Sequence, residues 1–373
     1  MKTHKNLFPQ VCSFQNLLLA YKKAKRGTKQ TYETNDYYFN LETKLLELQQ
    51  KLITQTYQPA EYRYFEIHEP KKRTISVATF TDRIVHHAVV NVLEPIYEKI
   101  FIYHSYATRK NKGTHKAVFK AQEYLQKNVW FLKSDIQKYF DNINHEILIK
   151  IISRKISDKK LLQLIEKIID NSKGHANSVT QQRSCSFNCT GIATSVAPVC
   201  SFSNIAEMSA TKVAVPNSGL PIGNLTSQFF ANVYLHELDN FVKNNLHQKF
   251  YIRYMDDFVI FSNNKQSLKD ILPKIEDFLS ENLSLNLKPK ATIINQHTNG
   301  LSFLGTRIFR SVIRIKSENL KRISKKVNEK QYLFYNNKIS EDDLISTYNS
   351  YNAFLDNYHV FSVKKDIFAT KGI

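Results

Sequence analysis

The sequence predicts an α+β fold, because short apolar runs typical of strands interleave with amphipathic segments without the regular alternation of a doubly wound sheet. Leucines recur at helical spacing within the first 60 residues, and apolar runs near residues 130 and 250 are typical of strands. The chain has 373 residues, of which 42% are hydrophobic and 12% aromatic. That length is sufficient for two or three subdomains around a substantial core.

Residues 1–60 are expected to form an N-terminal helical layer, since SFQNLLLAYKKAKRG and FNLETKLLELQQKLI each carry an apolar stripe. Two strands, EYRYFEIHEP and RTISVATF, should follow, and their turn places Lys71, Lys72 and Arg73 at or beside a hairpin tip. Helices are then expected over about residues 83–99 and from Thr114, a residue type that caps helices.

VWFLKSDI reads as a buried strand with Asp135 at its end, followed by helices over about residues 144–154 and 157–169. From about 171 to 218 the chain turns to Ser, Thr, Ala, Val and Asn with few charges, which predicts a long loop or insertion. This segment holds Cys185, Cys189, Cys200 and His175, but their spacing is not that of a zinc finger, so no zinc site is expected.

Order returns at GLPIGNLTSQFFANVYLHELDNF, a turn bracketed by glycines that leads into a helix. YIRYMDDFVIFS then predicts a hairpin with Asp256 and Asp257 at its tip. A helix near residues 267–280, a strand through ATIIN, a hairpin near LSFLGTRIFRSVIRI and two closing helices complete the prediction.

The charge of the chain favours a polyanionic partner. Lys and Arg number 53 against 33 Asp and Glu, which gives a formal net charge of +20 and a pI near 9.5. Solubility requires a net charge of only roughly 2 to 8 for a small domain, so nucleic acid is preferred over a merely solvated surface.

No apolar run approaches the roughly 18 residues of a membrane span, and the start MKTHKNLFPQ lacks a signal-peptide core. We therefore expect a soluble, cytoplasmic protein without a membrane partner. Four unevenly spaced cysteines, of which Cys12 is the first, are too few for a disulfide framework, so reduced thiols are expected.

The adjacent acids Asp256 and Asp257 have two interpretations, a polar turn or a metal-binding pair. Nucleotidyl transfer needs two divalent ions, and Mg²⁺ prefers hard oxygen ligands from more than one element. Asp135 would complete such a set if its strand neighbours the hairpin, because three crowded carboxylates without a cation would resist joint ionisation. Arg73 and Arg109 are candidate triphosphate clamps. The alternatives are a solvated basic turn and an Arg109 that neutralises a local acid.

Three blocks carry a family likeness: YMDD at 254–257, DIQKYFDNINH at 135–145 and GLPIGNLTSQFFANVYL before the hairpin. In order, spacing and context they resemble the palm motifs of reverse transcriptases, from about residue 62 to about residue 315. The resemblance implies a right-hand polymerase fold, with the helical layer at 1–60, fingers at 61–128, palm at 129–310 and thumb at 311–373. It also implies an RNA template, an RNA/cDNA duplex, dNTPs and two Mg²⁺ ions, or Mn²⁺, held by Asp135, Asp256 and Asp257.

The resemblance gives further residues a role. Phe140 matches the steric gate that rejects a ribose 2′ hydroxyl, Arg73 the fingers residue on the incoming triphosphate, and Lys290 the lysine that protonates pyrophosphate. FLG at 303–305 resembles the primer-grip hairpin. The substrate-binding residues are expected to be Lys72, Arg73, Arg109, Phe140, Ile222, Gly223, Gln228 and Tyr254. On the basic helix after the grip, a thumb following a duplex through its phosphates is preferred over a solvated face, with Lys321, Arg322, Lys325 and Lys326 as contacts.

LPIGNLTSQ and RKNKGTHKA most resemble the reverse transcriptases of diversity-generating retroelements, which copy RNA with errors at adenines beside a small basic accessory protein. Ile222 stands where most bacterial intron enzymes carry a glutamine, and it lacks the amide hydrogen bonds of that residue, so loosened discrimination is expected. The roughly 60 residues after the primer grip disfavour a mobile intron protein. An antiphage defence or retron enzyme, and a basic RNA-binding module with an inactive palm, remain alternatives.

Overall fold

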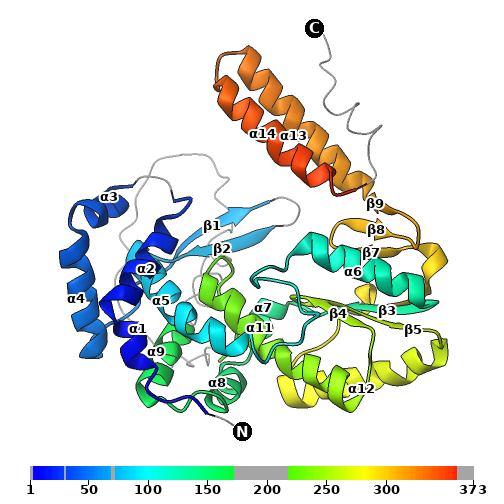
Figure 1. Cartoon of the computed structure of the whole chain (residues 1–373), viewed down its shortest axis with the longest axis horizontal. Helices are drawn as coiled ribbons and strands as arrows, with labels where there is room; N and C mark the ends of the chain where they lie inside the picture. The colour runs from blue at the N-terminus through cyan, green and yellow to red at the C-terminus, as the bar shows by residue number, and fades with distance from the viewer. Residues whose placement is uncertain (1–2, 29–30, 69–71, 172–216, 359–373) are drawn as a thin grey trace, which may run out of the picture. The chain divides into compact units, whose positions relative to one another are not determined.

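Figure 1 shows the computed structural model of the chain, which describes residues 3–28, 31–68, 72–171 and 217–358. Two compact units are formed, the first by Met1–Leu93 with Phe140–Gln228 and the second by Glu94–Tyr139 with Phe229–Ile373. Helices outnumber strands, and all the strand pairs within the described ranges are antiparallel. The α+β class predicted from the sequence is confirmed.

The first unit is mainly helical. Its helices are α1 (Phe8–Cys12), α2 (Phe14–Lys25), α3 (Tyr32–Phe39), α4 (Leu41–Ile53), α5 (Phe80–Tyr97), α7 (Tyr139–Asn142), α8 (His145–Ser153), α9 (Lys159–Asp170) and the start of α11 (Leu225–Asn240). In α4 the leucines at positions 45, 48 and 52 are buried, so the apolar stripe faces the core. Asn144 and Asp158 cap α8 and α9 by accepting backbone N–H bonds, which fixes where these helices begin.

A two-stranded sheet completes the first unit. Its strands β1 (Arg63–Ile67) and β2 (Arg73–Val77) pair with Ile67 opposite Arg73. Residues 69–71 at the tip, Lys71 among them, lie outside the described residues. The backbone N–H of Ser76 donates to the carbonyl of Ile222 at 2.8 Å, so the turn that precedes α11 is fixed against β2.

The second unit contains a four-stranded sheet. Its strands, in spatial order, are β4 (Tyr251–Tyr254), β5 (Asp257–Ser262), β3 (Trp130–Asp135) and β6 (Ile293–Gln296). Helix α6 (Thr114–Lys127) contacts β4, and α12 (Lys265–Leu283) contacts β3, β5 and β6. Figure 1 shows these two helices on opposite faces of the sheet. Apolar side chains on both faces of β5 are therefore buried, which explains its nearly continuous hydrophobic run.

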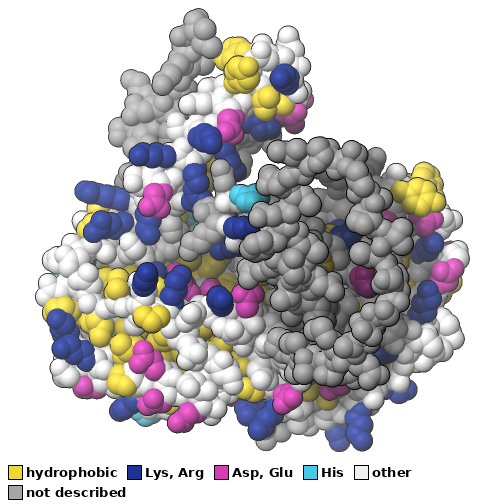
Figure 2. Space-filling model, turned by 180° about the vertical axis from the view of Figure 1, so that it is seen from behind, with side chains coloured by type: hydrophobic (Ala, Val, Ile, Leu, Met, Phe, Trp, Pro, Cys, Tyr) yellow, Lys and Arg dark blue, Asp and Glu magenta, His cyan; other side chains and the backbone are white. Residues whose placement is uncertain are grey.

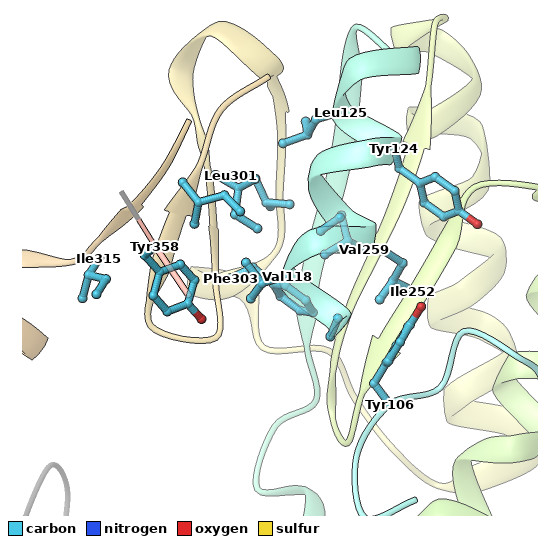
Figure 3. Close-up of a cluster of buried hydrophobic side chains, with 14 of the residues drawn as sticks. Tyr106, Val118, Tyr124, Leu125, Ile252, Val259, Leu301, Phe303, Ile315 and Tyr358 are labelled. Atoms are coloured by element: carbon cyan, nitrogen blue, oxygen red, sulfur yellow. The ribbon is translucent and has the colours of Figure 1, made fainter. Parts of the chain in front are cut away.

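A three-stranded sheet and a helical pair follow in the second unit. The sheet consists of β7 (Leu301–Phe303), β8 (Thr306–Ile308) and β9 (Ile313–Ile315), and the helices are α13 (Ser317–Tyr335) and α14 (Glu341–Leu355). Short helical turns occur at η1 (Phe241–Asn245), η2 (Pro289–Ala291) and η3 (His297–Asn299). One buried cluster joins α6, β4, β5 and the small sheet, and Figure 3 shows Val118, Val259 and Phe303 within it.

Most predicted elements are confirmed, and two details differ. Thr114 is the first residue of α6 rather than its cap, because Gly113 takes that position. The hairpin expected near LSFLGTRIFRSVIRI is a three-stranded sheet, since SVIRI adds a strand of its own. The predicted insertion lies outside the described residues from 172 to 216, and with it Cys185, Cys189, Cys200 and His175. Cys12 is a buried free thiol. Among the described residues there is no helix long and apolar enough to cross a membrane.

Candidate active site

The three predicted acids come together at one end of the four-stranded sheet. Asp135 ends β3, Asp257 begins β5, and the two are direct cross-strand partners. Asp256 precedes Asp257 in the two-residue connection from β4, since Tyr254 pairs with Asp257. The expectation that the strand of Asp135 neighbours the hairpin is confirmed, and the turn and metal interpretations of the hairpin tip are compatible.

The electrostatics of this end are dominated by crowding of negative charge. The pKa of Asp257 is raised to about 7, chiefly by burial and also by the charges of Asp135 and Asp256, against the opposing effect of Lys133. The Lys133 ammonium lies 3.4 Å from Asp257 Oδ1, and the Lys288 ammonium lies 3.9 Å from Asp135 Oδ2. Two cations therefore offset three carboxylates, and neither was predicted from the sequence. Lys133 shares a strand face with Asp135, two residues away, which is the signal that could have identified it.

The donor chemistry of this end fits a hard divalent cation. Asp257 Oδ1 is buried, and its polar contact among the described residues is the ion pair with Lys133 at 3.4 Å. Carboxylate oxygens from a strand end and a hairpin tip are the ligands that Mg²⁺ and Mn²⁺ prefer. Among the described residues, no group of three His, Cys, Asp or Glu side chains is already positioned to bind a metal ion. The cross-strand pair with its neighbour Asp256 is thus a ligand set that a cation would draw together.

A buried ion pair supports the hairpin tip. The Arg253 side chain is fully buried and pairs with Asp239 in two bonds, from Nε to Oδ1 at 2.7 Å and from Nη2 to Oδ2 at 2.6 Å. Its Nη1 donates to Asn232 Oδ1 at 3.1 Å and to the carbonyl of Met255 at 2.9 Å. Met255 has φ of +55°, a left-handed conformation that is uncommon for a long side chain. Arg253 thereby holds the strained residue that immediately precedes Asp256.

The remaining partners of this ion pair come from elsewhere in the second unit. Tyr251 donates its hydroxyl to Asp239 Oδ1 at 2.8 Å, and Asn232 donates to the carbonyl of Ala107 at 2.8 Å. Sequence reasoning missed Arg253 and Asp239. The available signal was an arginine inside an otherwise apolar strand, since a buried charge needs a partner.

Several predicted substrate residues lie together in the first unit. The N–H of Leu220 donates to the Phe140 carbonyl at 2.7 Å, while Ile222 is bonded to β2 through its own carbonyl. Gly223 has φ of +116°, and a Cβ there would lie 2.8 Å from Ile75 Cγ2 and 3.0 Å from the Ser76 carbonyl. Only glycine permits this close approach. Phe140, the expected steric gate, and Ile222, the expected fidelity position, are therefore linked by backbone hydrogen bonds of the loop that precedes α11. The Ile222 side chain is half-buried.

The basic residues at the tip of the β1–β2 hairpin are partly engaged in ion pairs. Lys72 pairs with Glu66 at 3.0 Å between two exposed side chains, and Arg73 is exposed at the start of β2. Such a surface pair contributes little stability, so Lys72 can exchange Glu66 for a phosphate. Arg73 has no ion pair among the described residues, which suits its expected role.

Arg109 does not suit the role expected of it. Its side chain is only 5% exposed and forms a salt bridge with Glu98 at 2.7 Å. Its Nη1 also donates to the carbonyls of Ile102 and Ser105, at 2.6 and 3.0 Å. In this structure the Arg109 guanidinium is bonded to local acceptors, so the expectation that it clamps the triphosphate stays a prediction without support from the geometry. The alternative, that it neutralises a local acid, is the one found.

The remaining predicted residues are placed as follows. Lys290 is exposed in the turn η2, whereas Lys288, just before Pro289, is the lysine that lies near Asp135. The Tyr254 hydroxyl accepts from Thr114 Oγ1 at 3.2 Å. Gln228 lies in the first turns of α11, where its backbone N–H donates to the Asn224 carbonyl.

The predicted thumb cations form an exposed row on α13. Lys321, Arg322, Lys325 and Lys326 are all exposed, while the buried side of the helix carries Ile323 and Val327. Lys325 lies 3.8 Å from Glu329, which is exposed as well. Figure 2 shows that Lys and Arg side chains are spread widely over the described part of the surface. The row matches the predicted spacing of four residues.

An antiparallel sheet that presents aspartates from a strand end and a hairpin tip defines the palm of a right-hand polymerase. Comparison with known families agrees: residues 67–308 match the family "Reverse transcriptase (RNA-dependent DNA polymerase)", which is well over half of the chain. The chain belongs to this family.

Curated relatives include intron-encoded proteins. The group II intron-encoded protein LtrA of Lactococcus lactis subsp. cremoris is 31% identical over 204 residues, which cover 54% of this chain and 28% of LtrA. The putative COX1/OXI3 intron 2 protein of Saccharomyces cerevisiae is 28% identical over 323 residues, covering 78% and 37%. Protein YkfC of Escherichia coli is 26% identical over 313 residues, covering 72% of each. The chain therefore spans only about a third of the length of the two intron proteins.

Among solved structures, the telomerase of Candida albicans in complex with a TWJ fragment of telomeric RNA is similar to this chain with a TM-score of 0.40 and 12% identity. The likeness covers 86% of this chain and 61% of the telomerase chain.

Proposed function

We propose that this chain is an RNA-directed DNA polymerase that copies a template RNA into cDNA from dNTPs. The observation that carries the proposal is the cross-strand pair of Asp135 and Asp257 beside Asp256, with the Asp257 carboxylate buried against the ammonium of Lys133. Membership of the reverse transcriptase family supports it. A silent palm would have no reason to keep three carboxylates crowded at a cost in ionisation.

In this proposal Asp135, Asp256 and Asp257 hold two Mg²⁺ or Mn²⁺ ions. When bound, such ions activate the attacking 3′ oxygen and neutralise charge on the triphosphate. Arg73, helped by Lys72, binds the triphosphate through charge-assisted hydrogen bonds. Phe140 excludes a ribose 2′ hydroxyl by its bulk, and Tyr254, Gly223 and Gln228 shape the rest of the nucleotide site.

Two lysines are candidates to protonate the pyrophosphate leaving group. The family resemblance favours Lys290, whereas the distance of 3.9 Å to Asp135 favours Lys288. A proton donor has to lie within reach of the reacting groups, so geometry takes precedence. We assign the role to Lys288. The exposed row Lys321, Arg322, Lys325 and Lys326 would follow the phosphates of the RNA/cDNA duplex.

Primer extension on an RNA template tests the function. Replacing Asp256 with Ala should abolish cDNA synthesis and leave RNA binding intact, because the side chain serves chemistry and not template affinity. Asp270→Ala on the exposed side of α12 is the matched control and should retain full synthesis. No cDNA synthesis by the wild type with RNA still bound would leave only the basic RNA-binding module, whereas equal synthesis by wild type and Asp256→Ala would refute the role assigned to Asp256.

We further propose that the cDNA is error-prone at template adenines, as part of a diversity-generating retroelement with a small basic accessory protein. The support is Ile222, an apolar side chain on a loop whose backbone is bonded to β2. Because the loop is held in place, the chemistry at this position depends on the side chain alone. Ile222→Gln should lower misincorporation opposite adenine in sequenced products, and Ile222→Leu should leave it unchanged. An unchanged error spectrum in Ile222→Gln would refute this part of the proposal.

A further inference from the structure

A basic and aromatic surface lies on the N-terminal helices, outside the proposed polymerase site. An open hollow of about 680 Å³ is lined by Lys22, Lys23, Lys25 and Arg26 of α2, together with Tyr21 and Tyr38. We call it the α2–α3 hollow. All four cations are exposed. None of them forms an ion pair within the part of the chain that the structure describes.

Three aromatic side chains of α3, close to these cations in the sequence, are largely exposed to solvent. Tyr32 is 91% exposed, Phe39 80% and Tyr38 57%. Tyr32 and Phe39 are seven residues apart on α3 and so share one face of the helix. Figure 2 shows hydrophobic side chains protruding at its right edge, where α3 lies. A group of neighbouring exposed rings, unlike a single one, is typical of a surface that binds a partner.

The rings and cations form one arrangement rather than two. The Lys25 ammonium lies 4.2 Å from the centroid of the Tyr38 ring and 5.9 Å from that of Tyr21. Tyr38 and Phe39 meet edge to face with centroids 5.4 Å apart. The Tyr21 ring lines the hollow, and its hydroxyl is buried without a hydrogen-bond partner among the described residues.

The acids of the same region do not neutralise the hollow. Asp36 pairs with Lys44 at 3.0 Å, and Glu33 accepts the backbone N–H of Phe80 at 2.7 Å. Both carboxylates are therefore engaged elsewhere. Lys23 donates to Asn91 Oδ1 at 2.5 Å, and the charges of Lys22, Lys25 and Arg26 remain available to an anion.

We propose that the α2–α3 hollow binds a single-stranded stretch of the template RNA. Exposed rings on which bases stack, set beside cations that follow the phosphates, are how proteins hold single strands without regard to sequence. A duplex keeps its base faces stacked inside and would leave Tyr32 and Phe39 unused. The RNA template is the proposed substrate of the polymerase site, and the hollow adds a second contact to the same strand.

Binding of a fluorescent 20-nucleotide oligouridylate to the full chain, measured by anisotropy over a series of salt concentrations, tests the proposal. Tyr38→Ala with Phe39→Ala should weaken binding roughly tenfold without changing the salt dependence, because stacking is uncharged. Lys22→Glu with Lys25→Glu should lower the slope of log K against log salt by about 1.4, at about 0.7 per lost phosphate contact. Tyr32→Ala, at a nearly free side chain, should also weaken binding and carries little risk to folding.

The control is Lys269→Glu with Lys274→Glu on the exposed side of α12, which changes the net charge equally. Unchanged affinity in the hollow variants, or an equal loss in this control, overturns the proposal. A second result would also overturn it: the wild type is a dimer, and Tyr38→Ala with Phe39→Ala makes it a monomer without changing its RNA affinity. The hollow would then be a contact between two copies of the chain. Extension of a primer on a template with a very short single-stranded part should stay normal in all hollow variants. If the wild-type chain makes no cDNA but the hollow variants lose oligouridylate binding, the proposed polymerase function is refuted. The proposal that the α2–α3 hollow binds RNA then still stands.

Discussion

The buried Arg253 side chain has two expected effects: it stabilises the second unit and it holds the conformation of the hairpin tip. Replacing Arg253 with Met should remove both. The substitution leaves the Asp239 carboxylate fully buried without its cation. Removing one partner of a buried pair costs about 3–5 kcal/mol. It also frees the carbonyl of Met255, whose left-handed backbone costs roughly 1–2 kcal/mol on its own. We therefore expect a destabilised chain with a disordered tip.

A triple variant, Arg253→Met with Asp239→Leu and Tyr251→Phe, removes the ion pair and the tyrosine hydroxyl, and leaves only the Asn232 Oδ1 and Met255 carbonyl acceptors without the Arg253 donor. Apolar replacement of both members of a buried ion pair is often neutral or stabilising, and Tyr251→Phe avoids leaving a buried hydroxyl without its acceptor. Stability should return to near that of wild type. Polymerase activity should not return, because Met255 still lacks the bond from Arg253.

The assay uses the single tryptophan of the chain, Trp130, which lies at the start of β3 in the second unit. Urea unfolding followed by its fluorescence should show a loss of several kcal/mol for Arg253→Met and recovery in the triple variant. Single-nucleotide extension should show kcat lowered about tenfold or more in both, since a hydrogen bond from a charged donor contributes about 1.5–3 kcal/mol. The KM for template should be unchanged. Wild-type kcat in the triple variant would refute the role assigned to Arg253.

Three further predictions concern the proposed chemistry. Phe140→Ala should admit ribonucleotides that Phe140→Tyr still rejects, measured as the ratio of rNTP to dNTP incorporation; an unchanged ratio would rule out Phe140 as the gate. The raised pKa of Asp257, about 7 against the usual 3.8, favours its protonated form in the folded chain, so its stabilising contribution is full below pH 3.8 and is lost as pH rises through 7. Without metal, the free energy of unfolding measured by urea titration should therefore fall by roughly 3 kcal/mol between pH 5 and 8, and Asp257→Asn should flatten that fall. Lys288→Met should lower the rate of single-turnover extension more than Lys290→Met does, because the lysine protonates the leaving pyrophosphate. The rate is measured as a function of pH. A larger loss in Lys290→Met would return the role to Lys290.

The parts of the site that the sequence predicts are those governed by short-range pattern. Asp135 ends an apolar run and Asp256 with Asp257 joins two others, so pairing of the three strands follows from burying those runs. Asp135 and Asp257 are then brought opposite each other by register alone.

Other positions depend on contacts that no pattern encodes. Glu98 reaches Arg109 across a loop, and the partner of Arg253 lies on a helix fourteen residues earlier. The choice between Lys288 and Lys290 depends on the turn η2 at Pro289, where a helical turn sends neighbouring side chains in different directions. These are geometric facts of the folded chain.

The most direct test of the central claim is single-turnover incorporation of one dNTP by the purified wild-type chain on a primed RNA template. The account predicts extension by one complementary deoxynucleotide when Mg²⁺ or Mn²⁺ is added, no extension after chelation, and none in Asp135→Asn despite unchanged template binding. Extension that persists in Asp135→Asn, or its absence in the wild type with template bound and metal present, would contradict the claim that these carboxylates form a polymerase site.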